Sequence, residues 1–331
     1  MGTTSSGSSA KRPKPPAASI PVRGLVHRMP ATNGTIHALV FSPDGTCLAS
    51  GAHDGTAQLW NVGSGKSVGA QDKRKDKWAV VGVAFGPGWG ELVLLTQGGK
   101  KATDNQFRVF RWDAVANTAS LLGGAAGVRF SRRSVAASPR GVALAGHPGI
   151  DWYDCPTGKW AEEAFPDAGP CEGVAFDRDM RHLAVAGKPG EVLVYEVGVK
   201  KPSRRLKGGK VPATCVRFSP DGTRVLAGDE AGGVWVWDAA TGKLVREGEG
   251  GPDEVLDITT LDNDEVVSAH GPGDGGVTLR RWSKAAVPAA EASLDGKLRA
   301  VAFSPDGRHV ATGDLEGELT VWDLALLLAD S

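Results

Sequence analysis

Short runs of apolar residues alternate with polar, glycine-rich turns along most of the chain, and one six-residue phrase punctuates them. Residues 40–45 read Val-Phe-Ser-Pro-Asp-Gly, and closely similar phrases occupy residues 217–222 and 302–307. Proline presets the backbone at the second position of a β-turn and glycine suits the fourth, so this phrase predicts a turn between two strands. Apolar runs of this length, bounded by such turns, predict strands rather than helices.

An aromatic residue, usually followed by an acid, ends a later apolar run in each unit. Successive aromatics lie 40 to 52 residues apart, and they are Trp60, Trp112, Tyr153, Tyr195, Trp237, Trp282 and Trp322. We therefore expect seven units, each with a strand, the Ser-Pro-Asp-Gly turn, a second strand, a glycine-rich turn, a third strand that ends on the aromatic, and a fourth strand. No segment predicts a helix longer than two turns.

These two phrases, repeated at this spacing, resemble the WD40-repeat family over residues 22–324. The resemblance implies an all-β fold, namely a seven-bladed β-propeller of four-stranded antiparallel blades. In that family a strand from the start of the chain completes the last blade, and we expect residues 23–28 to close the ring in this way. The chain departs from the family because no Gly-His dipeptide precedes its inner strands. We therefore expect apolar packing between blades, rather than the family's polar network, to hold the propeller together.

Composition indicates the domain boundaries and the compartment. Residues 1–21 are rich in Ser, Gly, Pro and Lys, so we expect a disordered tail ahead of a single propeller domain at residues 22–331. The 38 Lys and Arg residues balance 38 Asp and Glu residues, which argues against general attraction to nucleic acid or membranes. No stretch has the length of apolar sequence that a membrane span needs. The four cysteines are scattered singly, which is typical of buried, reduced thiols and predicts a cytoplasmic protein.

Few motifs could carry chemistry. Residues 271–276 satisfy Gly-x-Gly-x-x-Gly, but the run after them is strand-like, whereas a dinucleotide site needs a helix there. We expect His147 and His270 to be solvent-exposed in turns. Glu172 and Asp257 are the acids expected in inner strands, but their blades are not neighbours, so we expect no ring of carboxylates in the channel. The sequence therefore predicts no catalytic residue, no metal ligand and no cofactor.

One basic patch is the candidate site for a partner. The link into the second blade carries four cations and a tryptophan, and the long loop between the second and third strands of that blade adds two cations and an acid. Both segments belong to the same face of a propeller, so we expect them to converge. The patch residues are Lys73, Arg74, Lys75, Lys77, Trp78, Lys100, Lys101 and Asp104. Cations beside an aromatic suit an acidic peptide, a phosphate or stacked bases, and the alternative is an ordinary solvated loop.

The leading hypothesis for function is a non-catalytic protein–protein interaction scaffold, because the repeats are clear and no catalytic constellation accompanies them. We expect a monomer whose partners are other proteins or peptides, and neither nucleic acid nor a membrane. One alternative is a propeller enzyme with a metal or carboxylate site in its channel, which turnover or a bound metal would favour. Another is a nucleic-acid or phospho-ligand binder that uses the basic loops between blades, which salt-sensitive binding would favour.

Overall fold

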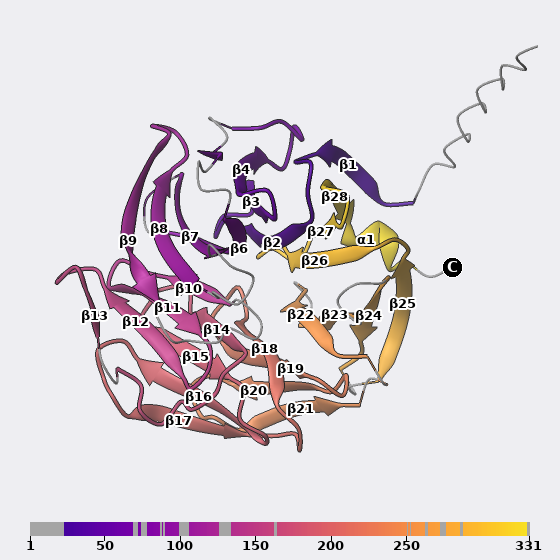
Figure 1. Ribbon diagram of the computed structural model, residues 1–331. Coiled ribbons are helices and arrows are strands. Elements are labelled where there is room, and N and C mark those ends of the chain that lie inside the picture. The colour runs from indigo at the N-terminus through magenta and orange to yellow at the C-terminus, as the bar shows by residue number, and fades with distance from the viewer. Residues whose placement is uncertain are drawn as a thin grey trace, which may run out of the picture.

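The computed structural model describes most of the chain after residue 22, and the described residues form 28 strands and one short helix (Figure 1). The described residues are 23–68, 72–73, 78–86, 88, 90–98, 106–125, 134–161, 164–249, 251, 253–261, 264–271, 276–284 and 287–329. The strands form seven sheets of four antiparallel strands each, arranged as blades around a central axis. The expectation of an all-β, seven-bladed propeller is confirmed. The expected tail at residues 1–21 lies outside the described residues.

Each blade runs from an inner strand at the axis to an outer strand at the rim. The inner strands are β2 (Ile36–Phe41), β6 (Ala79–Phe85), β10 (Val135–Ala137), β14 (Gly173–Phe176), β18 (Ala213–Phe218), β22 (Val255–Thr260) and β26 (Leu298–Phe303). The second strands are β3 (Cys47–Ala52), β7 (Glu91–Gly98), β11 (Gly141–Ala145), β15 (His182–Ala186), β19 (Arg224–Asp229), β23 (Val266–His270) and β27 (His309–Asp314). Blades are numbered 1 to 7 in this order, and inner strands of neighbouring blades contact one another all round the ring.

The third and outer strands complete the blades. The third strands are β4 (Thr56–Asn61), β8 (Gln106–Asp113), β12 (Ile150–Asp154), β16 (Glu191–Glu196), β20 (Val234–Asp238), β24 (Val277–Trp282) and β28 (Glu318–Asp323). The outer strands of blades 1 to 6 are β5 (Asp72–Lys73), β9 (Thr118–Ala125), β13 (Lys159–Ala161), β17 (Pro202–Lys207), β21 (Leu244–Gly248) and β25 (Pro288–Leu294). The helix α1 (Leu324–Leu327) follows β28. Because β24 begins directly after residues 271–276, the expectation that no helix follows this glycine motif is confirmed.

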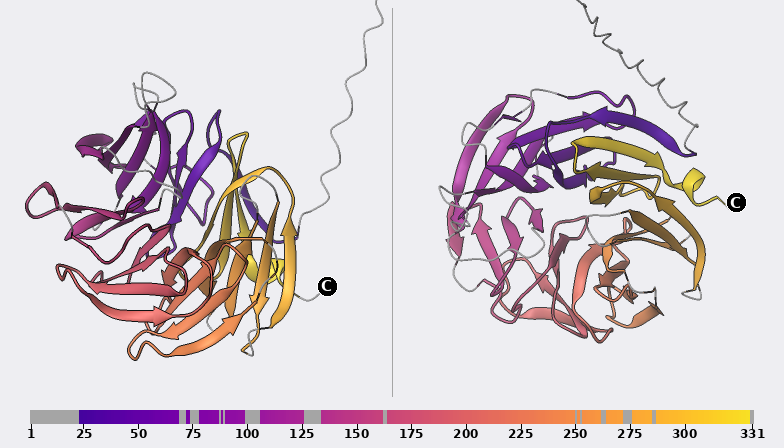
Figure 2. Two further views of the ribbon diagram at one scale, coloured as in Figure 1. Left: turned by 60° about the horizontal axis from the view of Figure 1, so that its bottom comes forward. Right: turned by 45° about the vertical axis from the view of Figure 1, so that its right-hand side comes forward.

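The outer strand of blade 7 comes from the start of the chain. Strand β1 (Leu25–Pro30) pairs antiparallel with β28, and it sets Leu25 opposite Trp322 and Pro30 opposite Glu318. Figure 2 shows the indigo β1 alongside the yellow β28. The Arg28 guanidinium adds an ion pair of 3.1 Å to Glu318. The expected closure is confirmed, and the strand lies two residues later than residues 23–28. The pairing covers the edge that β28 would otherwise expose.

The Ser-Pro-Asp-Gly phrases form the expected turns. In blade 1 the Gly45 amide donates to the Ser42 carbonyl at 2.9 Å, and Gly45 has a φ of 72°. Asp44 Oδ1 accepts from the Ser42 hydroxyl at 2.5 Å and from the Thr46 amide at 3.0 Å. Blades 5 and 7 repeat the serine–aspartate bond at 2.5 and 2.6 Å. The turn is therefore stabilised by its own side chains before any other blade contacts it.

The repeat tryptophans lie in the core, as expected. Trp112, Trp237 and Trp282 are each at most 1% exposed, since they end third strands that are covered on both sides. The indole N–H groups of the repeat tryptophans donate to different acceptors. Three blades use a hydroxyl of the second strand, and these bonds are Trp60 to Ser50 at 3.0 Å, Trp282 to Ser268 at 2.7 Å and Trp322 to Thr312 at 3.1 Å. In blade 5, Trp237 donates across to the Lys207 carbonyl of blade 4 at 2.8 Å. The expectation that apolar packing alone replaces the family's polar network is therefore wrong in these blades.

His270 is fully buried, so the expectation of an exposed turn histidine is wrong for this residue. Strand β23 extends through His270, which is its last residue, and Gly271 lies outside the strand. Its Nε2 lies 2.6 Å from the Ser268 hydroxyl, which also accepts the Trp282 indole. Burial, together with the charge of Arg280, lowers the pKa of His270 to about 4. His147, in contrast, is exposed as expected.

Candidate interaction surfaces

Two sets of loops form two faces of the disc. The link face consists of the segments between blades and the loops between second and third strands. Gly34 in the link before β2, for example, lies against Asp54 in the loop between β3 and β4. The turn face consists of the Ser-Pro-Asp-Gly turns and the loops between third and outer strands. Turns of neighbouring blades meet there, since Gly45 of blade 1 lies beside the Asp306 carboxylate of blade 7.

The basic patch predicted on the link face falls mostly outside the described residues. This holds for Arg74, Lys75, Lys77, Lys100, Lys101 and Asp104. The backbone of Lys73 pairs with Thr56 of β4, so Lys73 belongs to the outer strand β5 of blade 1 and not to the link into blade 2. The convergence of the remaining patch residues stays a prediction.

Trp78 is half-buried directly before β6, and its ring already has a cation against it. The Arg108 guanidinium carbon lies 4.0 Å from the centre of the Trp78 ring, which is a cation–π contact within blade 2. A side chain at Gly98 would collide with the indole, so the ring packs closely on the end of β7. The sequence analysis did not include Arg108 in the patch. Arg108 lies on β8, which pairs with β7, and this pairing is the signal that could have placed it near Trp78.

The acid of the inner strand β22 is engaged by both neighbouring blades. Asp257 Oδ1 lies 3.1 Å from Arg217 of β18, and its Oδ2 accepts from the Phe303 amide of β26 at 3.1 Å. The Asp257 side chain is almost completely buried, whereas that of Arg217 is 42% exposed. One carboxylate therefore ties three inner strands together. Glu172 directly precedes β14 of blade 4, so the expectation that it lies in an inner strand is wrong, whereas Asp257 does lie in β22 of blade 6.

The thiols lie in surroundings that keep them protonated. Cys47, Cys171 and Cys215 are buried as expected, and Cys155 is half-buried. Burial raises the pKa of both Cys171 and Cys215 to about 12. Since the thiolate is the reactive form, these two groups are poor nucleophiles and poor metal ligands at neutral pH. Within the described ranges, no three His, Cys, Asp or Glu side chains gather in a way that could hold a metal ion.

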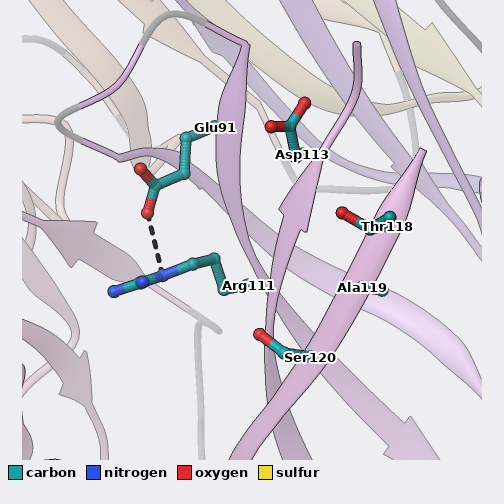
Figure 3. Close-up of a pocket in the computed structure, with 6 residues that line it drawn as sticks. All are labelled: Glu91, Arg111, Asp113, Thr118, Ala119 and Ser120. Atoms are coloured by element: carbon teal, nitrogen blue, oxygen red, sulfur yellow. Dashed lines mark ion pairs between the residues drawn. The ribbon is translucent and has the colours of Figure 1, made fainter. Parts of the chain in front are cut away.

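A polar pocket of about 370 Å³ opens on the face of blade 2 that looks toward blade 3 (Figure 3). Three neighbouring strands supply its walls, and the lining residues are Glu91 from β7, Arg111 and Asp113 from β8, and Thr118, Ala119 and Ser120 from β9. An ion pair of 2.9 Å joins Glu91 to Arg111. Asp113 Oδ1 accepts from the amides of Val115 and Ala116 and so holds the adjoining turn.

A second pocket, of about 300 Å³, lies on the turn face and is mainly apolar. Blade 1 contributes Pro43 and Leu59, blade 2 contributes Phe85, and blade 4 contributes Met180. Because blade 3 separates blade 4 from blade 2, a pocket lined from blades 1, 2 and 4 must lie over the mouth of the central channel. Among the described residues, blade 2 also contributes Gly86, Gly88 and Gly90 to the lining.

The seven sheets, the ring of inner strands and the closure by β1 define a β-propeller. A family model described as WD domain, G-beta repeat, matches residues 23–61, 200–238 and 291–323. Each matched segment ends on the residue after a repeat tryptophan, at Asn61, Asp238 and Asp323. The resemblance to the WD40-repeat family is confirmed, and these three segments of the chain match WD40 repeats.

Curated relatives share about a quarter of the aligned residues. "SIR4-interacting protein SIF2" of Saccharomyces cerevisiae is 25% identical over 46% of this chain and 28% of its own length. "U3 small nucleolar RNA-associated protein 18 homolog" of Arabidopsis thaliana is 24% identical over 50% of this chain and 31% of its own length. "WD repeat-containing protein 55 homolog" of Dictyostelium discoideum is 26% identical over 48% of this chain and 38% of its own length. The alignments thus span well under half of these relatives.

Proposed function

We propose that the protein is a non-catalytic interaction scaffold that binds other proteins or peptides through the loop faces of its propeller. The observation that carries the proposal is the closed ring, which holds two broad loop faces rigidly in place. Rigid presentation lowers the entropic cost of binding. The names of two relatives, one a SIR4-interacting protein and the other a protein associated with U3 small nucleolar RNA, also support the proposal.

The state of the buried polar groups supports a non-catalytic role. Asp257 is engaged by Arg217 and by the Phe303 amide, so it is not poised as a general base. The Cys171 and Cys215 thiols are protonated at neutral pH. We therefore assign Asp257, Cys171 and Cys215 a structural role, and we propose that charged side chains of the loops recognise the partner.

The basic patch on the link face remains the proposed contact with an acidic partner. No helix in the described part of the chain has the length and apolar character needed to cross a bilayer. We propose a cytoplasmic monomer, although relatives are named for nucleolar RNA and for pre-mRNA splicing.

The test is affinity capture from the native host followed by binding measurements on the partner identified. We expect Arg74→Glu with Lys101→Glu to weaken binding by roughly tenfold at low salt, because the reversal replaces attraction by repulsion. The matched control is Lys159→Glu with Lys243→Glu, which reverses two exposed charges on the turn face. Equal effects of the two double variants would overturn the link-face assignment. The absence of any specific protein partner, or salt-sensitive capture of nucleic acid alone, would overturn the scaffold proposal.

A further inference from the structure

We propose that the apolar pocket on the turn face is a peptide-binding site that takes one apolar side chain from a basic segment of a partner. The inference deepens the scaffold proposal, and it rests on that proposal for the source of the peptide. The inference names a surface on the turn face and the chemistry of the ligand that this surface would take. Peptide binding can be measured without the native partner, so its failure is distinguishable from failure of the scaffold proposal.

The walls of the pocket suit an aliphatic or methionine side chain. Leu59 forms part of the buried wall, Phe85 is half-buried, and Pro43 and Met180 lie toward the opening. The volume of about 300 Å³ is at the lower end for ligand pockets, which fits a single anchoring side chain better than a large cofactor.

Met180 has a backbone conformation that methionine rarely adopts. Its φ is 56°, and the equivalent turn position in blades 1, 5 and 7 is occupied by Gly45, Gly222 and Gly307 with φ of 66–72°. Glycine reaches this left-handed region without strain, whereas a residue with a Cβ does not. The turn therefore keeps a methionine where glycine would be more stable. A flexible, polarisable thioether is well suited to pack against differing apolar partners. We infer that Met180 serves this role in the pocket.

The rim of the pocket carries negative charge on the blade 1 side. The contacts of Asp44 with Ser42 and Thr46 all go to its Oδ1. The Ser42 hydroxyl and the Thr46 amide lower the pKa of Asp44, so the carboxylate is ionised at neutral pH. Asp306 of blade 7 also lies next to this turn, but it is paired with Arg308 at 3.7 Å, so Asp44 is the carboxylate that gives the rim its negative charge. The exposed Arg178 stands on the blade 4 side, next but one to Met180. We infer that the apolar side chain enters beside Met180 and that a neighbouring lysine or arginine of the peptide faces Asp44.

The experiment is a selection from a random heptapeptide library on the wild-type protein, followed by measurement of Kd for the enriched peptides. We expect enrichment of an apolar residue next to lysine or arginine. The decisive variant is Met180→Gly, which removes a wall of the pocket and also relieves the backbone. We expect it to weaken peptide binding at least tenfold while the melting temperature stays the same or rises. The matched control is Met180→Leu, which keeps an apolar wall and should bind within about twofold of the wild type.

A purely structural role for Met180 predicts the opposite pattern, with a lower melting temperature for Met180→Gly and no change in Kd. That pattern would overturn the proposal. Failure to enrich any peptide, or enrichment of acidic sequences, would also overturn it. Binding that does not weaken as salt is raised would contradict the role of Asp44.

Discussion

The imidazole of His270 accepts a hydrogen bond from the Ser268 hydroxyl, with Nε2 and Oγ 2.6 Å apart. The direction follows from the other ring nitrogen, since the Asp253 carbonyl can only accept and therefore places the ring proton on Nδ1, which leaves Nε2 of the neutral ring to accept from Ser268. The Ser268 oxygen also accepts the Trp282 indole N–H. The Nδ1–H then points to the Asp253 carbonyl at 3.3 Å. This chain of bonds requires a neutral histidine, in agreement with its lowered pKa.

Stability should therefore fall in mildly acidic solution. The pKa of His270 is about 4 in the folded protein, against its usual 6.5. Between these values the unfolded chain binds a proton that the folded chain rejects, so stability present above pH 6.5 is lost as the pH falls toward 4. The full effect is about 3 kcal/mol in the free energy of unfolding. Chemical denaturation at a series of pH values measures it.

The control for this prediction is His270→Gln, which removes the titrating group and keeps a polar side chain. We expect the variant to be less stable at pH 7.5 and to lose less stability on acidification than the wild type. Parallel pH profiles for the two proteins would show that His270 does not titrate as stated.

Removal of the closing strand should open the ring. Deleting residues 1–30 takes away β1 and exposes the backbone of β28, so we expect the melting temperature to fall by about 10 °C or more and aggregation to increase. Deleting only residues 1–18 should leave the melting temperature unchanged. If both truncations melted at the same temperature, pairing with β28 would contribute nothing to stability.

The two kinds of tryptophan should differ in what they contribute. Trp237→Ala should cost about 3–5 kcal/mol, because it leaves a cavity in a closed core and removes the bond to the Lys207 carbonyl of blade 4. Trp78→Ala should cost far less, about 1–2 kcal/mol, because the ring is only half-buried and the change removes one cation–π contact with Arg108. Urea denaturation of both variants gives the comparison. A larger loss for Trp78 would mean that the start of blade 2 is more tightly packed than the structure shows.

Local chemistry explains why so much of the fold could be predicted. The turn at Ser42 and Asp44 is stabilised by hydrogen bonds between residues two to five positions apart. The phrase therefore forms the same turn wherever it recurs. The spacing of the aromatics fixed the number of blades for the same reason. The error at His270 arose at a strand end, where a glycine marked the turn but not the last residue of the strand.

The candidate surfaces could be predicted much less well. The contact of Trp78 with Arg108 joins residues 30 positions apart, and Asp257 meets Arg217 from a neighbouring blade. No periodic pattern encodes such pairs, because the first depends on how segments of one blade pack together and the second on how one blade packs against the next. The apolar pocket is the clearest case, since blades 1, 2 and 4 have no common sequence signal that brings them together.

The sequence by itself determined the repeat, the seven blades and the turns, because each depends on short-range geometry or on a count of repeats. The closing strand followed from the resemblance to the WD40-repeat family. Only the tertiary structure decided that His270 is buried and neutral, that Asp257 ties three inner strands together, and that Met180 stands over the channel mouth. These features depend on contacts between distant segments, and those contacts exist only once the ring has closed and fixed the distances between blades.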